Sequence, residues 1–99
     1  MGIIDNNLDK IKILCEKYKV ARLFVFGSVL TELFDKSSDI DCLVDFKDVN
    51  VDEYADYYFG FKKAMENLLK REVDLVEDKA IRNPYLRESV DNSKRLIYG

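Results

Sequence analysis

Histidine is absent from this chain of 99 residues, which also has no tryptophan, one proline, two cysteines and four glycines. Without an imidazole, a Ser-His or Cys-His nucleophilic pair and a His-ligated zinc site are excluded within the chain. Both cysteines fall among apolar residues, Cys15 in a helical pattern and Cys42 in a strand pattern, which is typical of reduced, buried thiols. Aspartate and glutamate are therefore the strongest candidates for metal-assisted chemistry.

The chain also lacks a long apolar run and an excess of positive charge. No apolar segment approaches the roughly 20 residues that span a bilayer, and the N-terminus has no basic region before an apolar core. We therefore expect a cytoplasmic protein. The formal net charge is −3 and the pI is about 5.0, with basic residues scattered or paired with acids, so long RNA or DNA is not an expected ligand.

The length suits one domain spanning residues 1–99, and no internal repeat is visible. Apolar spacing predicts helices over residues 8–19, 28–34, 51–70 and 84–92, and strands over 21–26, 39–46, 72–76 and 95–98. Asn6 or Asn7 is the expected cap of the first of these helices, and Pro84 suits the first position of the last. This order predicts an α/β or α+β domain with helices packed on a small sheet, while the strand directions stay open.

The most informative stretch runs from the strand 21–26 into Gly27-Ser28 and, after ten residues, into Asp39-Ile40-Asp41. Strand alternation predicts Asp39, Asp41 and Leu43 on one face and Ile40, Cys42 and Val44 on the other. Two adjacent carboxylates repel each other, which favours a bound cation. Gly27 lets the backbone come close to a ligand, and Ser28 with the following helical amides suits a phosphate group.

Asp74 interrupts the apolar run 72–76 and is a candidate third member of this acidic cluster. Mg²⁺ prefers oxygen ligands and is often shared between carboxylates and substrate phosphates, so phosphoryl-type transfer with one or two ions needs no histidine. Asp74 is then a metal ligand or the general base nearest an acceptor hydroxyl. Each feature alone also has a structural interpretation: Gly27-Ser28 as a turn, Asp39 as a cap, and Asp41 and Asp74 as solvated strand residues.

In this order and spacing, Phe26-Gly27-Ser28, Asp39-Ile40-Asp41 and Val73-Asp74-Leu75-Val76 resemble the minimal nucleotidyltransferase (MNT) family of the DNA polymerase beta superfamily. The resemblance implies a small mixed sheet flanked by helices, ATP or another NTP as substrate, and Mg²⁺ or Mn²⁺. It implies catalytic, metal-binding acids at Asp39, Asp41 and Asp74, and nucleotide binding at Gly27 and Ser28. Family members are often antitoxins paired with a HEPN-domain ribonuclease toxin, and some transfer AMP to a tyrosine of that toxin.

The chain departs from the family at one point, because many members have Arg-Gly where this sequence has Thr31-Glu32. A cation expected near the phosphates is then missing, unless Lys62-Lys63 or Lys70-Arg71 replaces it. Two functions follow as hypotheses. The first is an Mg²⁺-dependent transfer of a nucleoside monophosphate, AMP from ATP, to a hydroxyl of a partner protein. The second is a catalytically weak module that neutralises a partner by complex formation.

Five aromatic residues fall within eight positions, namely Tyr54, Tyr57, Tyr58, Phe59 and Phe61. Helical spacing places most of them in the core or at its rim. A domain of this size cannot bury all five, so we expect some of them at a subunit interface, in a homodimer or in a complex with another protein.

Overall fold

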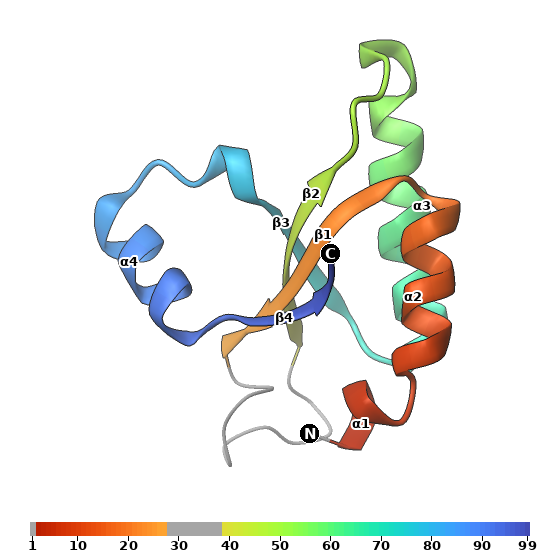
Figure 1. Ribbon diagram of the computed structural model, residues 1–99, viewed down its shortest axis with the longest axis horizontal. Helices are drawn as coiled ribbons and strands as arrows, with labels where there is room; N and C mark the ends of the chain where they lie inside the picture. The colour runs from red at the N-terminus through yellow and green to blue at the C-terminus, as the bar shows by residue number, and fades with distance from the viewer. Residues whose placement is uncertain (1, 28–38) are drawn as a thin grey trace.

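A computed structural model describes residues 2–27 and 39–99 of the protein. These residues form a four-stranded mixed sheet in the order β3-β2-β1-β4 (Figure 1). The strands are β1 (Val20–Phe26), β2 (Ile40–Phe46), β3 (Val73–Glu77) and β4 (Arg95–Tyr98). β1 runs antiparallel to β2 and β4, whereas β2 and β3 are parallel. The predicted mixed sheet flanked by helices is confirmed.

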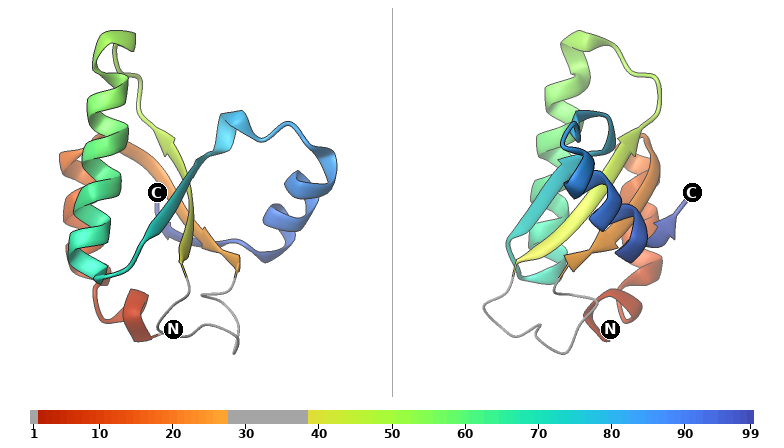
Figure 2. Two further views of the ribbon diagram at one scale, coloured as in Figure 1. Left: turned by 180° about the vertical axis from the view of Figure 1, so that it is seen from behind. Right: turned by 90° about the vertical axis from the view of Figure 1, so that its left-hand side faces the viewer.

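Helices cover both faces of the sheet (Figures 1 and 2). α2 (Leu8–Lys17) and α3 (Val51–Leu69) lie on one face, and α4 (Pro84–Ser93) lies on the other. α1 (Gly2–Asp5) and the 3₁₀ helix η2 (Asp78–Ala80) are short. α3 forms the long connection that parallel strands need, and it carries the chain from the end of β2 back to the start of β3.

The main core lies between the sheet and the layer of α2 and α3. α3 contributes Phe61, Met65 and Leu69, which recur every four residues and so form one buried stripe. Cys15 and Cys42 are buried and unpaired, as predicted. Burial raises the pKa of each thiol to about 12, which makes both unreactive.

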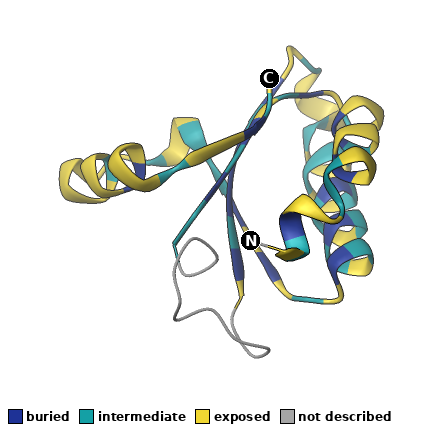
Figure 3. Ribbon diagram, turned by 60° about the horizontal axis from the view of Figure 1, so that its bottom comes forward, coloured by how far each residue is buried: buried dark blue, intermediate teal, exposed yellow. Residues whose placement is uncertain are grey.

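The other face of the sheet is covered more thinly, because Val90 is the one residue of α4 that is buried (Figure 3). Leu43 shares the face of Asp41, as predicted, yet its side chain is fully buried. The acidic face is thus polar at the start of β2 and apolar further along the strand. The long aromatic helix is also mixed, since Phe61 is fully buried while Phe59 is 62% exposed.

Several predicted boundaries were wrong by one or two residues. β2 begins at Ile40, so Asp39 precedes the strand, and β3 begins at Val73 and extends to Glu77. Asn7 precedes α2 but makes no capping bond, because its Nδ2 donates to the Ile3 carbonyl at 2.8 Å. The predicted helix 28–34 and turn 35–38 lie outside the described residues. No helix in the described part of the chain is long and apolar enough to cross a membrane.

Candidate active site

The structure brings two of the predicted acids together across neighbouring strands. The parallel register of β2 and β3 pairs Asp41 directly with Asp74. Adjacent strands lie about 4.8 Å apart, so the two side chains leave the sheet side by side. Asp41 is half-buried and Asp74 is exposed. Nothing in the sequence alone established this pairing, because it depends on the parallel register set by α3.

Asp39 lies next to the pair, just before the first residue of β2, and is exposed. Burial raises the pKa of Asp41, and the nearby charges of Asp74 and Asp39 raise it further. The charges of Asp74 and Asp39 therefore reach Asp41 through space. The charged form of Asp41 is the form that a bound cation would stabilise.

Gly27 follows β1 directly and lies beside the same acid, because the register pairs Phe26, the last residue of β1, with Asp41. Its φ of +76° lies in the left-handed region. A Cβ added at this position would overlap the Asp41 Oδ2 atom. The close approach that requires a glycine here is that of the Asp41 carboxylate, and the approach of a ligand to Gly27 stays a prediction. Ser28, the other predicted nucleotide-binding residue, lies outside the described residues.

A divalent ion fits this donor set through two carboxylates rather than three. Within residues 2–27 and 39–99, no three His, Cys, Asp or Glu side chains converge closely enough to hold one metal ion. Mg²⁺ commonly binds through one or two carboxylates, with the remaining positions filled by water and substrate phosphates. The paired Asp41 and Asp74, whose mutual repulsion a cation relieves, match that mode of binding.

A cavity of about 300 Å³ adjoins the acids at the β3 edge of the sheet. Its lining residues come from the start of β2, from α3 and from the start of β3: Asp39, Lys62, Glu66, Glu72, Val73 and Asp74. Glu66 is held in place there, since its Oε2 accepts a hydrogen bond from the Val73 amide at 3.0 Å.

Sequence reasoning did not find Glu66 and Glu72 as members of this cavity. The spacing of Lys62 and Glu66, four residues apart, shows that they share a helix face, but it does not show that this face meets the start of β3. Lys62 was one of the cations considered for the phosphates, and the structure places it in the cavity while its neighbour Lys63 is exposed.

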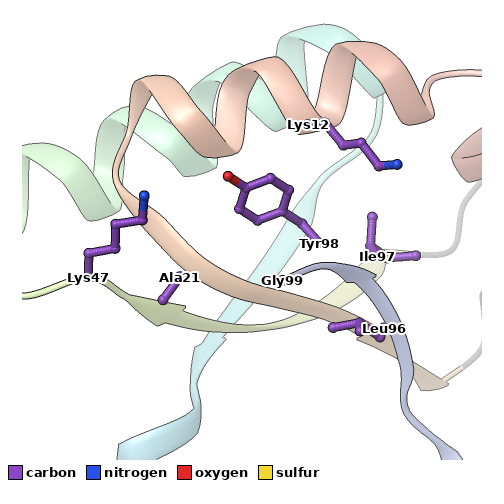
Figure 4. A pocket seen from close by; sticks show the side chains of 7 residues that line it. All are labelled: Lys12, Ala21, Lys47, Leu96, Ile97, Tyr98 and Gly99. Carbon is purple, nitrogen blue, oxygen red and sulfur yellow. The ribbon is translucent and has the colours of Figure 1, made fainter.

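A second cavity, of about 490 Å³, lies at the opposite edge of the sheet, along β4. Lys12 and Lys47 lie at its sides with Tyr98 between them (Figure 4). None of the predicted acids lines it, and β4 is separated from β2 by β1. This cavity therefore does not belong to the acidic site.

Comparison with known sequences decides the family. Residues 9–97 match the family described as "Nucleotidyltransferase domain". The chain belongs to the nucleotidyltransferase family. Two Methanocaldococcus jannaschii proteins named "putative protein adenylyltransferase" are similar to it, one 42% identical over 89 residues and the other 37% identical over 87 residues. Each alignment covers 88% of this chain and 84% of the relative. The chain is thus an enzyme of the nucleotidyltransferase kind, and the predicted family is confirmed.

Solved structures agree with this assignment. The structure of a protein named "putative minimal nucleotidyltransferase" superposes with a TM-score of 0.76 at 29% identity, over 93% of this chain and 90% of that one. A chain from the complex of a tri-AMPylated Shewanella oneidensis HEPN toxin with an MNT antitoxin superposes with a TM-score of 0.65 at 22% identity, over 96% of this chain and 71% of that one. The second likeness shows a shared fold.

Proposed function

We propose that this nucleotidyltransferase moves AMP from ATP to a hydroxyl of a partner protein, in an Mg²⁺-dependent reaction, and acts as the antitoxin of a HEPN-type toxin. The observation that carries the proposal is the pairing of Asp41 with Asp74 beside Gly27. The adenylyltransferase relatives support AMP as the transferred group, and the complex with the HEPN toxin supports a protein acceptor. The whole chain, residues 1–99, would act as one domain in the cytoplasm.

We assign metal binding to the three acids and triphosphate binding to the turn after β1. Asp41 and Asp74, with Asp39 beside them, would hold the divalent ion. Gly27 and Ser28 would hold the triphosphate, with backbone amides facing its oxygens. When bound, the ion neutralises phosphate charge and lowers the pKa of an attacking hydroxyl. Mn²⁺ offers similar oxygen coordination and is expected to replace Mg²⁺.

In the reaction, the acceptor hydroxyl oxygen forms a bond to the α-phosphorus of ATP. The bond from that phosphorus to the bridging oxygen of the β-phosphate breaks, and pyrophosphate leaves with the electron pair. We assign to Asp74 the removal of the hydroxyl proton. Its position on the edge strand and its exposure support this role, because the carboxylate could pass the proton to water. The products are an AMP-modified protein and pyrophosphate.

A binding module without efficient catalysis is the second candidate. Two features favour it: the chain has Thr31-Glu32 where the family resemblance implies Arg-Gly, and no three potential ligands converge in the described part of the chain. Such a module would neutralise its partner by covering it. Both candidates bind the same kind of partner, so catalysis is the property that separates them.

The test is a labelling assay with ATP carrying a labelled α-phosphate, Mg²⁺, and the protein that co-purifies with this chain from its own host. Transfer is expected to label the partner band, and the Asp39→Asn/Asp41→Asn double variant is expected to remove the label. A stable complex that takes up no label with any NTP would overturn the enzymatic proposal in favour of the binding module.

A further inference from the structure

We propose that the acceptor protein docks along the edge formed by α3 and β3, with an apolar side chain in an aromatic groove and basic side chains over the acidic cavity. This inference rests on the proposed function, since it identifies the surface and chemistry by which that reaction recognises its acceptor. The occupant is a protein segment that carries a hydroxyl and is flanked by apolar and basic residues.

The direction of approach follows from the order of the strands. Attacking and leaving oxygens lie roughly in line on opposite sides of the transferred phosphorus. In the sheet, β1 with Gly27 and β3 with Asp74 lie on opposite sides of β2, which carries Asp41. If pyrophosphate leaves on the Gly27 side, the hydroxyl must approach from the side of β3. β3 is the edge strand on that side of the sheet, and α3 lies next to it (Figure 2).

The described residues that line the cavity at this edge are mostly acidic, which favours a basic side chain as its occupant. Among the residues that the structure describes, four carboxylates line it, those of Asp39, Glu66, Glu72 and Asp74, together with one ammonium group, that of Lys62. A bound metal ion would partly neutralise Asp39 and Asp74. Glu72 is exposed, so its carboxylate can pair with a basic side chain of the acceptor. A basic side chain next to the acceptor hydroxyl complements this surface, and an acidic one is repelled.

An aromatic groove continues along the same edge. It has a volume of about 350 Å³ and is lined by Tyr54, Ala55, Tyr58, Phe59, Glu77 and Ala80. Tyr58 fixes one wall to the sheet, because its hydroxyl donates to the Leu75 carbonyl. Phe59 lines this groove and is 62% exposed. Exposed aromatic side chains beside a pocket are typical anchors of protein interfaces.

The groove and the cavity are close enough for one segment to occupy both. Asp74 and Glu77 belong to the same strand and are three residues apart, which corresponds to about 10 Å. Asp74 lines the acidic cavity, and Glu77 lines the aromatic groove. Residues three apart on a strand point to opposite faces of the sheet, so the side chain of Asp74 lies on the face of α4 and that of Glu77 on the face of α3. An extended acceptor segment that runs along β3 alternates in the same way, so it would place its hydroxyl at Asp74 and an apolar side chain, about three residues away, against Phe59.

The competing surface is α4, which lies on the other face of the sheet and carries Tyr85, 82% exposed. Phe59 and Tyr85 can therefore be compared by single substitutions. Ile13 on α2, 64% exposed and remote from the acids, is a control with nearly the same exposure as Phe59. All three side chains are exposed, so their replacement by alanine should leave the fold intact.

The experiment measures labelling of the host partner with α-labelled ATP and Mg²⁺ by wild type, Phe59→Ala, Ile13→Ala and Tyr85→Ala. A parallel thermal-shift assay measures the binding of ATP with Mg²⁺. We expect Phe59→Ala to slow labelling about tenfold at low partner concentration, as loss of one interface anchor does, with recovery at high partner concentration. The thermal shift of Phe59→Ala with ATP and Mg²⁺ should equal that of wild type. Ile13→Ala and Tyr85→Ala should equal wild type in both the rate of labelling and the thermal shift.

Wild-type labelling by Phe59→Ala would overturn the docking inference and leave the proposed function standing. Loss of labelling in Tyr85→Ala, with Phe59→Ala unaffected, would overturn it in favour of approach across α4. Wild-type protein that gives neither label nor thermal shift would overturn the proposed function, and the docking inference with it.

A second experiment tests the charge of the cavity: Glu72→Lys should weaken labelling of the partner, whereas Glu16→Lys on α2 should not.

Discussion

Gly27 has a left-handed backbone conformation and lies directly against the Asp41 carboxylate. An alanine at φ +76° costs about 1–2 kcal/mol, and its Cβ would force the Asp41 carboxylate to move. We therefore expect Gly27→Ala to lower the free energy of unfolding by about 1–3 kcal/mol in urea denaturation, and to abolish the thermal shift with ATP and Mg²⁺. Gly2→Ala is the control, because the nearest atom to its added Cβ is Asn6 Nδ2 at an ordinary 3.7 Å. Equal stability of the two variants would contradict the role of Gly27.

The folded structure disfavours the charged form of the Asp41 side chain. Burial, then Asp74 and Asp39, raise its pKa above that of the unfolded chain, so the folded protein binds its proton more tightly. The metal-free wild type therefore loses stability as pH rises through the pKa of the folded state. Asp41→Asn should stabilise the metal-free protein at pH 7 by less than ~1 kcal/mol, the range for partly exposed charges, and should give no gain below the unfolded pKa.

Thermal unfolding with EDTA, as a function of pH, checks this prediction. The same variant should lose the stabilisation by ATP with Mg²⁺, since a ligand raises stability only through its binding to the folded state. A large loss of metal-free stability in Asp41→Asn would instead show that this carboxylate is structural.

At the scale of elements, α4 has one buried residue, Val90, and is held by its N-terminal cap and by an ion pair from its middle. Asn83 Oδ1 accepts hydrogen bonds from the Tyr85 and Leu86 amides at 2.9 and 3.3 Å, and Arg87 bonds to the Asp78 carboxylate at 2.9 Å. We expect Asn83→Ala to cost about 1 kcal/mol and to raise amide hydrogen exchange in α4 before the sheet is affected. Asn92→Ala, an exposed position in the same helix, should change stability by less than ~0.5 kcal/mol. Uniform exchange across α4 and the sheet would contradict this order.

The elements also differ in how well the sequence predicts them. α3 was predicted over residues 51–70 and is observed over Val51–Leu69, because its apolar stripe and its length exclude a strand. The start of β2 was placed at Asp39, one residue early, since a polar residue at a strand end has no periodic signal of its own. α1 has four residues and shows too little pattern to be predicted.

For the whole molecule, the two neighbouring phenylalanines of α3 separate core from surface. Phe61 is fully buried and lies near the Tyr18 and Phe46 rings, whereas Phe59 is 62% exposed. We expect Phe61→Ala to lose about 3–5 kcal/mol of a total of about 5–15, and Phe59→Ala to lose less than about 0.5. Chemical denaturation measures both. Similar losses in the two variants would mean that the groove beside Phe59 is part of the core, which would also remove the basis for the docking surface.

Local patterns in the sequence were enough to establish the candidate residue types and the strand or turn pattern in which each lies. The absence of histidine limited the chemistry to carboxylates and metal, and the order Gly27, Asp39-Ile40-Asp41 and Asp74 within strand patterns indicated the family, because side-chain alternation and turn chemistry are local properties. Only the tertiary structure decided that β2 and β3 are parallel and in a register that places Asp41 opposite Asp74. It also decided that Lys62, Glu66 and Glu72 share a cavity with Asp39 and Asp74. Such pairings depend on how α3 packs against the sheet, and contacts between residues far apart in the chain leave no periodic signal in the sequence.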